Sequence, residues 1–145
     1  MENEDEILSA LQQGVTAAVE QSDAPDLPVK YLLVSSGDNT QWQGVPGDQK
    51  WLELVWLPNN PRNAFLGQEE NHRGILRMIL HWPSSGGGVY APIELFKSIT
   101  RYFANGTLLS GTQIVGKPVP TGIVEDGDDV LFPVSIYYQS YRKGA

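Results

Sequence analysis

The feature that most constrains the fold is the stretch from Trp51 to Trp82, in which two strand-like runs are joined by a polar segment. In the second run an apolar register alternates with a charged one, and this period of two predicts a strand with one buried face. The apolar register contains Leu76, Met78, Leu80 and Trp82, and the charged register contains Arg73, Arg77 and His81. Ile75 and Ile79 also fall in the charged register, so the outer face of this strand is expected to be partly apolar.

The first run, from Trp51 to Leu57, is apolar in both registers, and only Glu53 interrupts it. Apolar residues in both registers favour a central strand that is covered on both sides. Together, the two runs predict a long antiparallel hairpin at the centre of a sheet.

Helices and further strands around this hairpin are predicted from the spacing of apolar residues. One helix is expected from about Asp5 to Gln21, and a second is expected to begin near Pro92 and to stop at Asn105 and Gly106. Further strands are predicted at Val29–Val34, Gln113–Val119 and Val130–Tyr138. The chain is therefore expected to be a single α+β domain over residues 1–145, with a central antiparallel or mixed β-sheet of about five strands and two helices packed on it.

The charge balance excludes some classes of partner. The chain has 17 acidic and 10 basic residues and a net charge of -7, so it has no sequence-wide attraction to nucleic acid or to an anionic membrane. It contains no cysteine, which excludes disulfides and thiolate metal sites. Because the N-terminus is acidic and no apolar run approaches roughly 18 residues, we expect neither a signal peptide nor a membrane span, and synthesis in the cytoplasm.

A search for catalytic or ligand-binding groups finds little. His72 and His81 are nine residues apart on one predicted strand, a separation of about 30 Å, so they cannot share a metal ion and are interpreted as surface or interface residues. The glycines at 86–88 lack the Lys and Ser or Thr of a phosphate-binding loop, and the acidic residues at 125–129 lack the spacing of a calcium loop. We therefore predict no catalytic residue, no cofactor and no metal site.

The polar segment between the two runs, from Pro58 to Arg73, is the most distinctive candidate for a contact surface. A hairpin connection of about 14 residues is much longer than the usual length of about two to five. It combines apolar Phe65 and Leu66 with both signs of charge, a composition typical of surfaces that order on assembly. The alternative is a loop that folds back so that these two side chains plug the edge of the core. The tail from Gln139 to Ala145 is polar and is expected to fray.

The overall pattern resembles the bacteriophage tail-terminator or tail-completion family. The resemblance rests on Trp51-Leu-Glu-Leu with Leu57-Pro58, on Leu66-Gly67, on Asn71-His-Arg-Gly-Ile-Leu76, on a glycine-rich turn before a helix with Phe103 near its end, and on Asp126-Gly127 before Phe132-Pro-Val-Ser-Ile-Tyr-Tyr138. It covers about Trp51 to Tyr141 and, more loosely, the first predicted helix. Residues 35–50 are not matched.

This resemblance implies a structural, non-enzymatic virion protein without a cofactor. Such a protein would form a ring, usually of six copies, that caps the finished tail tube and offers a surface for head joining. Its implied partners are other copies of itself, the tail tube protein and head-tail connector proteins, and its location is the head-proximal end of the tail. DNA would pass through the lumen without specific binding, which agrees with the acidic balance, and no membrane is involved.

A closed ring needs two different contact patches on each subunit. We expect the long loop to be one patch, with Arg62, Phe65, Leu66, Glu69, Glu70, His72 and Arg73 as its residues. The second patch is expected on the exposed face around Arg77 and His81. Two alternatives remain open: a head-tail connector or head-completion protein of the same assembly pathway, and, less favoured, a small-ligand-binding protein with a pocket between helix and sheet.

Overall fold

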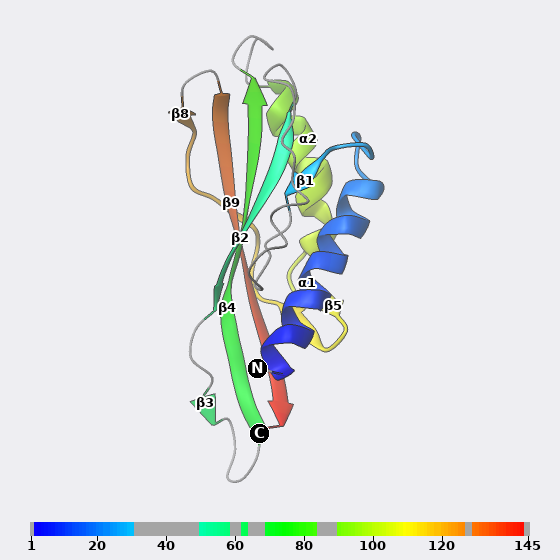
Figure 1. Ribbon diagram of the computed structural model, residues 1–145, viewed down its shortest axis with the longest axis vertical. Helices are drawn as coiled ribbons and strands as arrows, with labels where there is room; N and C mark the ends of the chain where they lie inside the picture. Colours follow the sequence, from blue (N-terminus) through cyan, green and yellow to red (C-terminus); the bar gives the residue numbers. More distant parts are fainter. Residues whose placement is uncertain are drawn as a thin grey trace.

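The computed structural model describes residues 2–30, 50–58, 62–63, 69–83, 90–126 and 129–143. The elements in chain order are α1 (Glu2–Glu20), β1 (Val29–Lys30), β2 (Trp51–Pro58), β3 (Arg62–Asn63), β4 (Glu69–Pro83), α2 (Tyr90–Thr100), the 3₁₀ turn η3 (Arg101–Phe103), β5 (Leu108–Leu109), β6 (Thr112–Ile114), β7 (Val119–Pro120), β8 (Val124–Asp126) and β9 (Asp129–Lys143). Figure 1 shows the two helices beside a long, twisted sheet. The predicted α+β class is confirmed.

The described strands form one nine-stranded sheet in the order β1-β2-β4-β9-β6-β5, with β3 paired to β4, and β7 and β8 paired to β9. The sheet is mixed because β1 and β2 are parallel, whereas every other pair is antiparallel. Its strand number exceeds the predicted five. The additional strands have only two or three residues, which is too short to produce a readable alternation in the sequence.

The predicted hairpin is confirmed by the antiparallel register of β2 and β4, in which Leu52 faces Leu80 and Leu54 faces Met78. On its other side β4 pairs with β9 along all 15 residues, from Glu69 opposite Lys143 to Pro83 opposite Asp129. Because β2 pairs only with residues 74–81 of β4, the ladder of β4 and β9 continues beyond the end of β2. In Figure 1 this extension points downward, and both chain termini lie at the same end.

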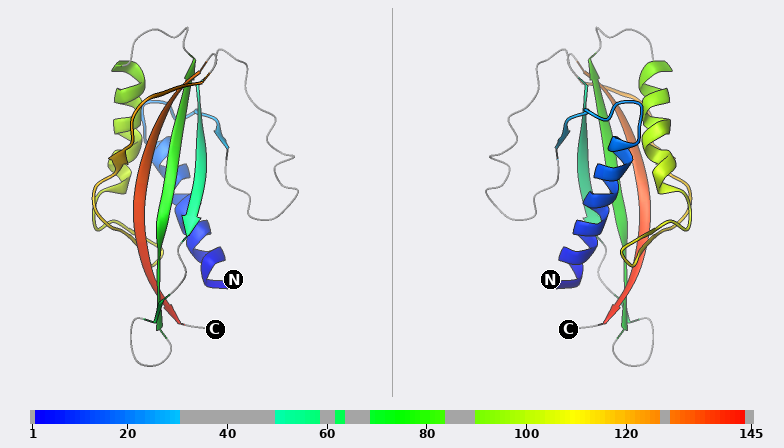
Figure 2. Two further views of the ribbon diagram at one scale, coloured as in Figure 1. Left: turned by 90° about the vertical axis from the view of Figure 1, so that its left-hand side faces the viewer. Right: turned by 90° about the vertical axis from the view of Figure 1, so that its right-hand side faces the viewer.

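Both helices pack on the same face of the sheet, as the two side views in Figure 2 show. The sheet contributes the fully buried side chains of Leu52, Leu54, Leu76, Met78, Leu80 and Ile136, and the helical segments contribute Ile7, Leu11, Val15, Ile99 and Phe103. The apolar positions of α1 recur every three to four residues, which places them on one stripe toward the sheet. The even-numbered register of β4 is therefore the buried one, as its alternation predicts.

The helix boundaries agree closely with those expected from the sequence. The first helix begins at Glu2, before the predicted Asp5, and the second continues through η3 to Phe103. The chain then turns at Gly106, which has a φ of 88° that a glycine adopts without steric strain.

On the side of the sheet that the helices cover, two close contacts are possible because a glycine has no side chain. A Cβ at Gly14 of α1 would lie 2.9 Å from Leu109 Cδ1, so this glycine allows the helix to approach β5 closely. A Cβ at Gly74 of β4 would lie 2.5 Å from Tyr138 Oη and 2.8 Å from the carbonyl oxygen of Leu57. The phenol of Tyr138 thus occupies the space over Gly74, where it accepts a hydrogen bond of 2.8 Å from Trp56 Nε1.

Several expectations about loops are wrong. The segment from Pro58 to Arg73 is not one long loop, because residues 62–63 form β3 and residues 69–73 belong to β4. Residues 139–143 of the tail do not fray, because their backbone pairs with residues 69–73 of β4. The strand expected over residues 113–119 is divided into β6 and β7, with Gly116 at a φ of 80° between them. Of the strand expected from Val29, the structure describes only β1.

Candidate assembly interface

The sheet has a second face on which no helix of the described chain lies (Figure 2). We call this the open face. Its central residues, assigned from the strand registers, are Trp51, Glu53, Val55 and Leu57 of β2, Ile75, Arg77, Ile79 and His81 of β4, and Leu131, Pro133, Ser135 and Tyr137 of β9. The odd-numbered side chains of β2 lack the helical cover that buries Leu52 and Leu54; Trp51, Glu53 and Val55 are half-buried, and Leu57 is exposed.

An apolar row crosses the open face from strand to strand. Leu57 faces Ile75, Ile75 faces Tyr137, and the backbone nitrogen of Val115 donates a hydrogen bond of 2.8 Å to the carbonyl oxygen of Tyr137. Leu57 is 41% exposed, Tyr137 42% and Val115 41%, while Ile75 is half-buried. A contiguous exposed apolar surface of this kind marks a site of contact with another molecule.

Two arginines lie on either side of this row in β4. Arg73 is exposed beside Gln139, and Arg77 is half-buried between Val55 and Ser135 of the neighbouring strands. The Nε atom of Arg77 is buried and has no hydrogen-bond partner within the described residues. Burying such a donor without an acceptor costs about 1–3 kcal/mol, and more for a charged group.

His81 lies further along the same face but is not exposed. Its ring stacks on Trp51, with the ring centroids 3.7 Å apart and an interplanar angle of 8°. Its Nε2 is 2.8 Å from Glu53 Oε1, and its Nδ1 is 3.9 Å from Asp129 Oδ2. The residue is only 8% exposed, so the expectation of an exposed His81 is wrong. The reason is its position opposite Trp51 in the register of β2 and β4, which brings the two rings face to face.

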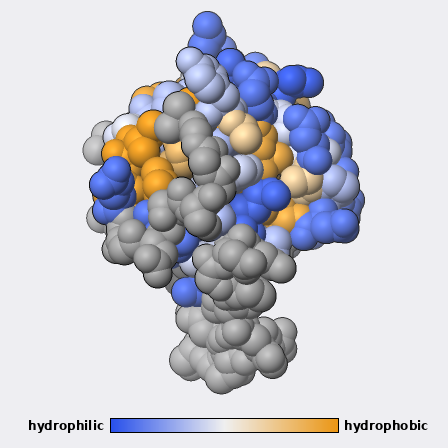
Figure 3. All heavy atoms as spheres, turned by 90° about the horizontal axis from the view of Figure 1, so that it is seen from above, coloured by the Kyte–Doolittle hydropathy of each residue, from blue (hydrophilic) through white to orange (hydrophobic). Residues whose placement is uncertain are grey.

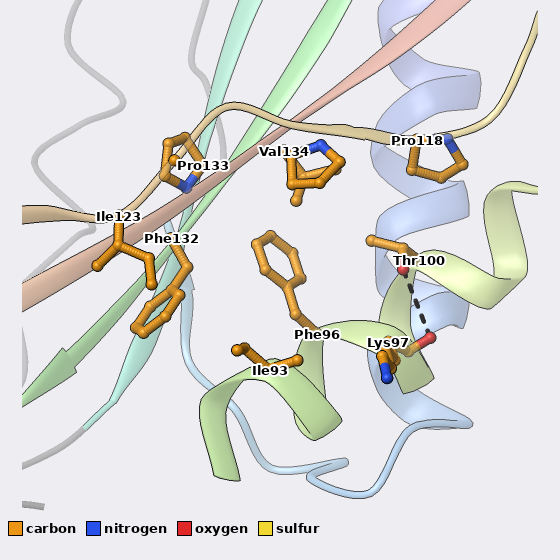
Figure 4. Close-up of a pocket in the computed structure, with 11 residues that line it drawn as sticks. Ile93, Phe96, Lys97, Thr100, Pro118, Ile123, Phe132, Pro133 and Val134 are labelled. Carbon is orange, nitrogen blue, oxygen red and sulfur yellow. Dashed lines mark hydrogen bonds between the residues drawn. The ribbon is translucent and has the colours of Figure 1, made fainter. Parts of the chain in front are cut away.

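An apolar groove of about 420 Å³ lies beside β9, between α2 and the segment that runs from Pro118 to Ile123. Figure 4 shows side chains from α2, from this segment and from β9 converging on it; they include Ile93, Phe96, Thr100, Pro118, Ile123, Phe132 and Val134. Lys97 is the cation at its rim, and its Nζ is 3.6 Å from Glu94 Oε1. Because the lining offers so few polar groups, the groove suits apolar side chains and not a polar ligand.

The family model described as phage tail terminator protein matches residues 6–138. The chain belongs to this family. The resemblance seen in the sequence is thereby confirmed, and the chain is a structural component of a phage tail. No curated protein matches the sequence.

For a phage tail terminator, the predicted contact residues divide between the two faces of β4. Arg73, Arg77 and His81 are odd-numbered and share the open face, as expected. His72 is even-numbered, lies opposite Ser140 and is 4% exposed, so the surface role expected of it is wrong, and the alternative role at an interface stays a prediction. The two histidines thus point to opposite sides of one strand, which agrees with the prediction that they share no metal. Among the described residues no group of three or more His, Asp or Glu side chains could hold one.

Three of the remaining predicted contact residues belong to the far end of the ladder. Arg62 is in β3, where it pairs with Asn71, and Glu69 and Glu70 begin β4, where they pair with β9. Phe65 and Leu66 lie outside the described residues. Neither described helix is long and apolar enough to cross a membrane.

Sequence reasoning missed the groove, and the available signal was slight. Ile123 and Val124 precede the acidic residues of their segment, and both are 51% exposed. In Figure 3, hydrophobic side chains gather at the left margin of the molecule, the side on which Figure 1 places β8. The available signal is a pair of adjacent aliphatic residues shortly after Pro118 and Pro120.

Proposed function

We propose that this phage tail terminator is the subunit of a closed ring that caps the tail tube at its head-proximal end. The ring ends polymerisation of the tube and presents the surface to which the head is joined. It contains about six copies, and residues 1–145 act in it as one domain whose role is contact between proteins and not catalysis. Family membership supports a tail role, and the open face supports assembly.

The single observation that carries this proposal is the open face. Its apolar row is exposed in the isolated chain, and it includes an arginine whose Nε lacks a partner within the described residues. A monomer that remained single would keep the apolar row in contact with water at a cost in solubility. A neighbouring copy that covers the face removes the apolar surface from water and supplies polar partners.

A ring built from one kind of subunit also needs a second, different patch. We place it at the end of the β4 and β9 ladder, with Arg62, Phe65, Leu66, Glu69, Glu70 and Arg73 as contact residues. His72 belongs to the same region, where its burial against β9 suits a role in holding the strands together. Arg77 and His81 belong to the open face, where His81 positions Trp51 and Glu53.

The net charge of -7 suits a ring through which DNA passes. An acidic lumen repels the phosphate backbone, so DNA is expected to move through without specific binding. Purified protein mixed with DNA at low salt, where attraction is strongest, should show no shift in a gel.

Light scattering and electron microscopy test the proposal together. Purified protein, with a subunit mass of 16.0 kDa, is expected to form a particle of about six copies at high concentration or on tube ends. Negative-stain images of isolated tubes should show a ring at one end, and added protein should stop tube growth. A strictly monomeric protein, both alone and with tubes, would contradict the proposal.

The second patch has its own test. Replacing Phe65 and Leu66 with Ser should leave the melting temperature nearly unchanged and abolish ring formation. A large loss of stability would instead assign both side chains to the core. Pull-down on isolated tubes and on filled heads separates the main proposal from its runner-up, because binding to heads alone would place the chain at the connector.

A further inference from the structure

We propose that adjacent subunits contact each other through the open face of one copy and the groove edge of the next, with Arg77 paired to Glu125 across the boundary. The groove edge comprises the apolar groove, Ile123, Val124 and Glu125. This inference rests on the proposed ring and identifies its contact surfaces. The occupant of each surface is a second copy of this chain.

Arg77 has no carboxylate partner among the described residues of its own subunit. Its neighbours across the strands are Val55 and Ser135, and its neighbours on the same side of β4 are aliphatic. Glu53 shares the open face, but it is bonded to His81. Arg77 is half-buried, its buried Nε has no hydrogen-bond partner within the described residues, and no carboxylate of those residues forms an ion pair with it. A partly buried cation is stabilised by an anion.

Glu125 is a carboxylate that lacks a cationic partner in the described chain, as Arg77 lacks an anionic one. Glu94, Glu53 and Asp129 each lie within 4.0 Å of a basic nitrogen, whereas exposed Glu125 has no ion pair in the described chain. Among the other carboxylates whose side chains the structure describes, Glu20, Asp23 and Asp26 also have no ion pair, and they lie around the end of α1, where no large apolar side chain is exposed. Glu125 follows Ile123 and Val124, each 51% exposed. It therefore lies beside apolar side chains, as Arg77 does.

The positions of the two surfaces on the subunit permit this contact. The open face and the groove occupy different parts of the subunit, so one copy can use both at once, which a head-to-tail contact around a ring requires. Tyr137 extends from the open face with 42% of its surface exposed, and aromatic side chains that enter a pocket are typical centres of protein interfaces. The groove of about 420 Å³ is large enough to receive it.

The prolines at the groove edge indicate side-chain contact and not strand addition. Pro118 and Pro120 have no backbone N-H to donate, and β7 consists of only two residues. An edge of this kind is protected from pairing with a strand of another molecule. The neighbouring subunit is therefore expected to bind through the side chains of its apolar row and Arg77, without adding a strand to this edge of the sheet.

Charge exchange tests the pairing. Arg77→Glu and Glu125→Arg should each weaken subunit association about a hundredfold, and the double variant should recover most of that loss. The readout is particle mass by light scattering over a dilution series, with thermal melts to verify folding. Glu20→Arg is the matched control, because it makes the same charge change outside both surfaces and should assemble normally.

Two results would overturn the inference: Arg77→Glu assembling as the wild type does, or a double variant as weak as the single ones. If Arg77→Glu fails to fold, a double-mutant cycle with Arg77→Gln and Glu125→Gln replaces it, and strictly additive losses would then contradict the pairing. The proposed ring fails separately, if the wild-type protein itself forms no oligomer.

Discussion

The two faces of the sheet are built from the same three long strands, yet they differ in what covers them. On the helical face, Leu76, Met78 and Ile136 are completely buried under α1 and α2. Ile75, the residue before Leu76 in β4, lies on the open face and is half-buried, and its cross-strand neighbour Tyr137 is 42% exposed. The helical face therefore stabilises the subunit, and the open face is available for assembly.

The comparison also shows how each face treats polar groups. On the helical side, the Trp56 indole and the Tyr138 phenol satisfy each other within the chain. On the open face, the polar groups of His81 and Glu53 are paired, but Arg77 Nε is not paired within the described residues. Unpaired buried groups occur on both sides, since Trp82 Nε1 of the even-numbered register also has no hydrogen-bond partner within the described residues.

The largest expected effect comes from truncating a side chain of the helical face. Leu76→Ala should lower the free energy of unfolding by about 2–5 kcal/mol, because it removes transfer energy and leaves a cavity. Ile75→Ala, one residue away on the open face, should lower it by only about 1 kcal/mol. Denaturant titrations of both variants measure the difference, and equal losses would abolish the distinction between the two faces.

Gly74→Ala should have the next largest effect. Its Cβ would meet the Tyr138 phenol at 2.5 Å and the Leu57 carbonyl oxygen at 2.8 Å. Overpacking of this kind costs about 1–3 kcal/mol, opposite in sign to the gain that Ala usually brings within a strand. A melting temperature at or above that of the wild type would show that Tyr138 does not need this space.

Trp56→Phe should cost about 1 kcal/mol, because it removes the donor to Tyr138 Oη and leaves the ring's apolar body largely in place. Trp82→Phe is the matched control, since the buried Nε1 of Trp82 has no hydrogen-bond partner in the described chain. Its loss should be smaller than that of Trp56→Phe. The opposite order in urea titrations would contradict the assigned role of the hydrogen bond.

The smallest effect on folding is expected on the open face. Tyr137→Ser should change the free energy of unfolding by only about 0.5 kcal/mol and yet prevent ring formation. Leu108→Ser is its control, because Leu108 is 67% exposed on β5, outside the open face. Light scattering should show assembly for the second variant and none for the first; assembly of both would remove Tyr137 from the interface.

The sequence predicted the elements with strong periodicity. The alternation in β4 identified its buried register, and the helical stripes identified α1 and α2 to within a few residues. The strands predicted at Val29–Val34 and Gln113–Val119 overlap β1 and β6, but β3, β5, β7 and β8 were not recognised as separate strands, because two or three residues carry no measurable period. The pairing of residues 69–73 with the polar tail was also missed, since backbone hydrogen bonds hold that ladder together without an apolar pattern.

For the candidate interface, the sequence placed Arg77 and His81 on one face but could not show how exposed each is. Burial of His81 depends on Trp51, which lies 30 positions earlier in the chain and becomes its neighbour only through the register of two strands. The groove depends on three segments that meet only in the folded chain. Sites assembled from distant segments leave weak local signals, whereas the family resemblance extends along the chain and was recognisable.

The most direct test of the open face as the assembly surface is chemical labelling of single cysteines, which the absence of natural cysteine makes specific. Leu57→Cys places a thiol on the apolar row, and Ser9→Cys places one on the exposed side of α1. In the assembled particle, the thiol at position 57 is expected to be protected from a maleimide, while the thiol at position 9 reacts as fast as in the dissociated subunit. Equal and rapid labelling at both positions of the intact particle would contradict the account.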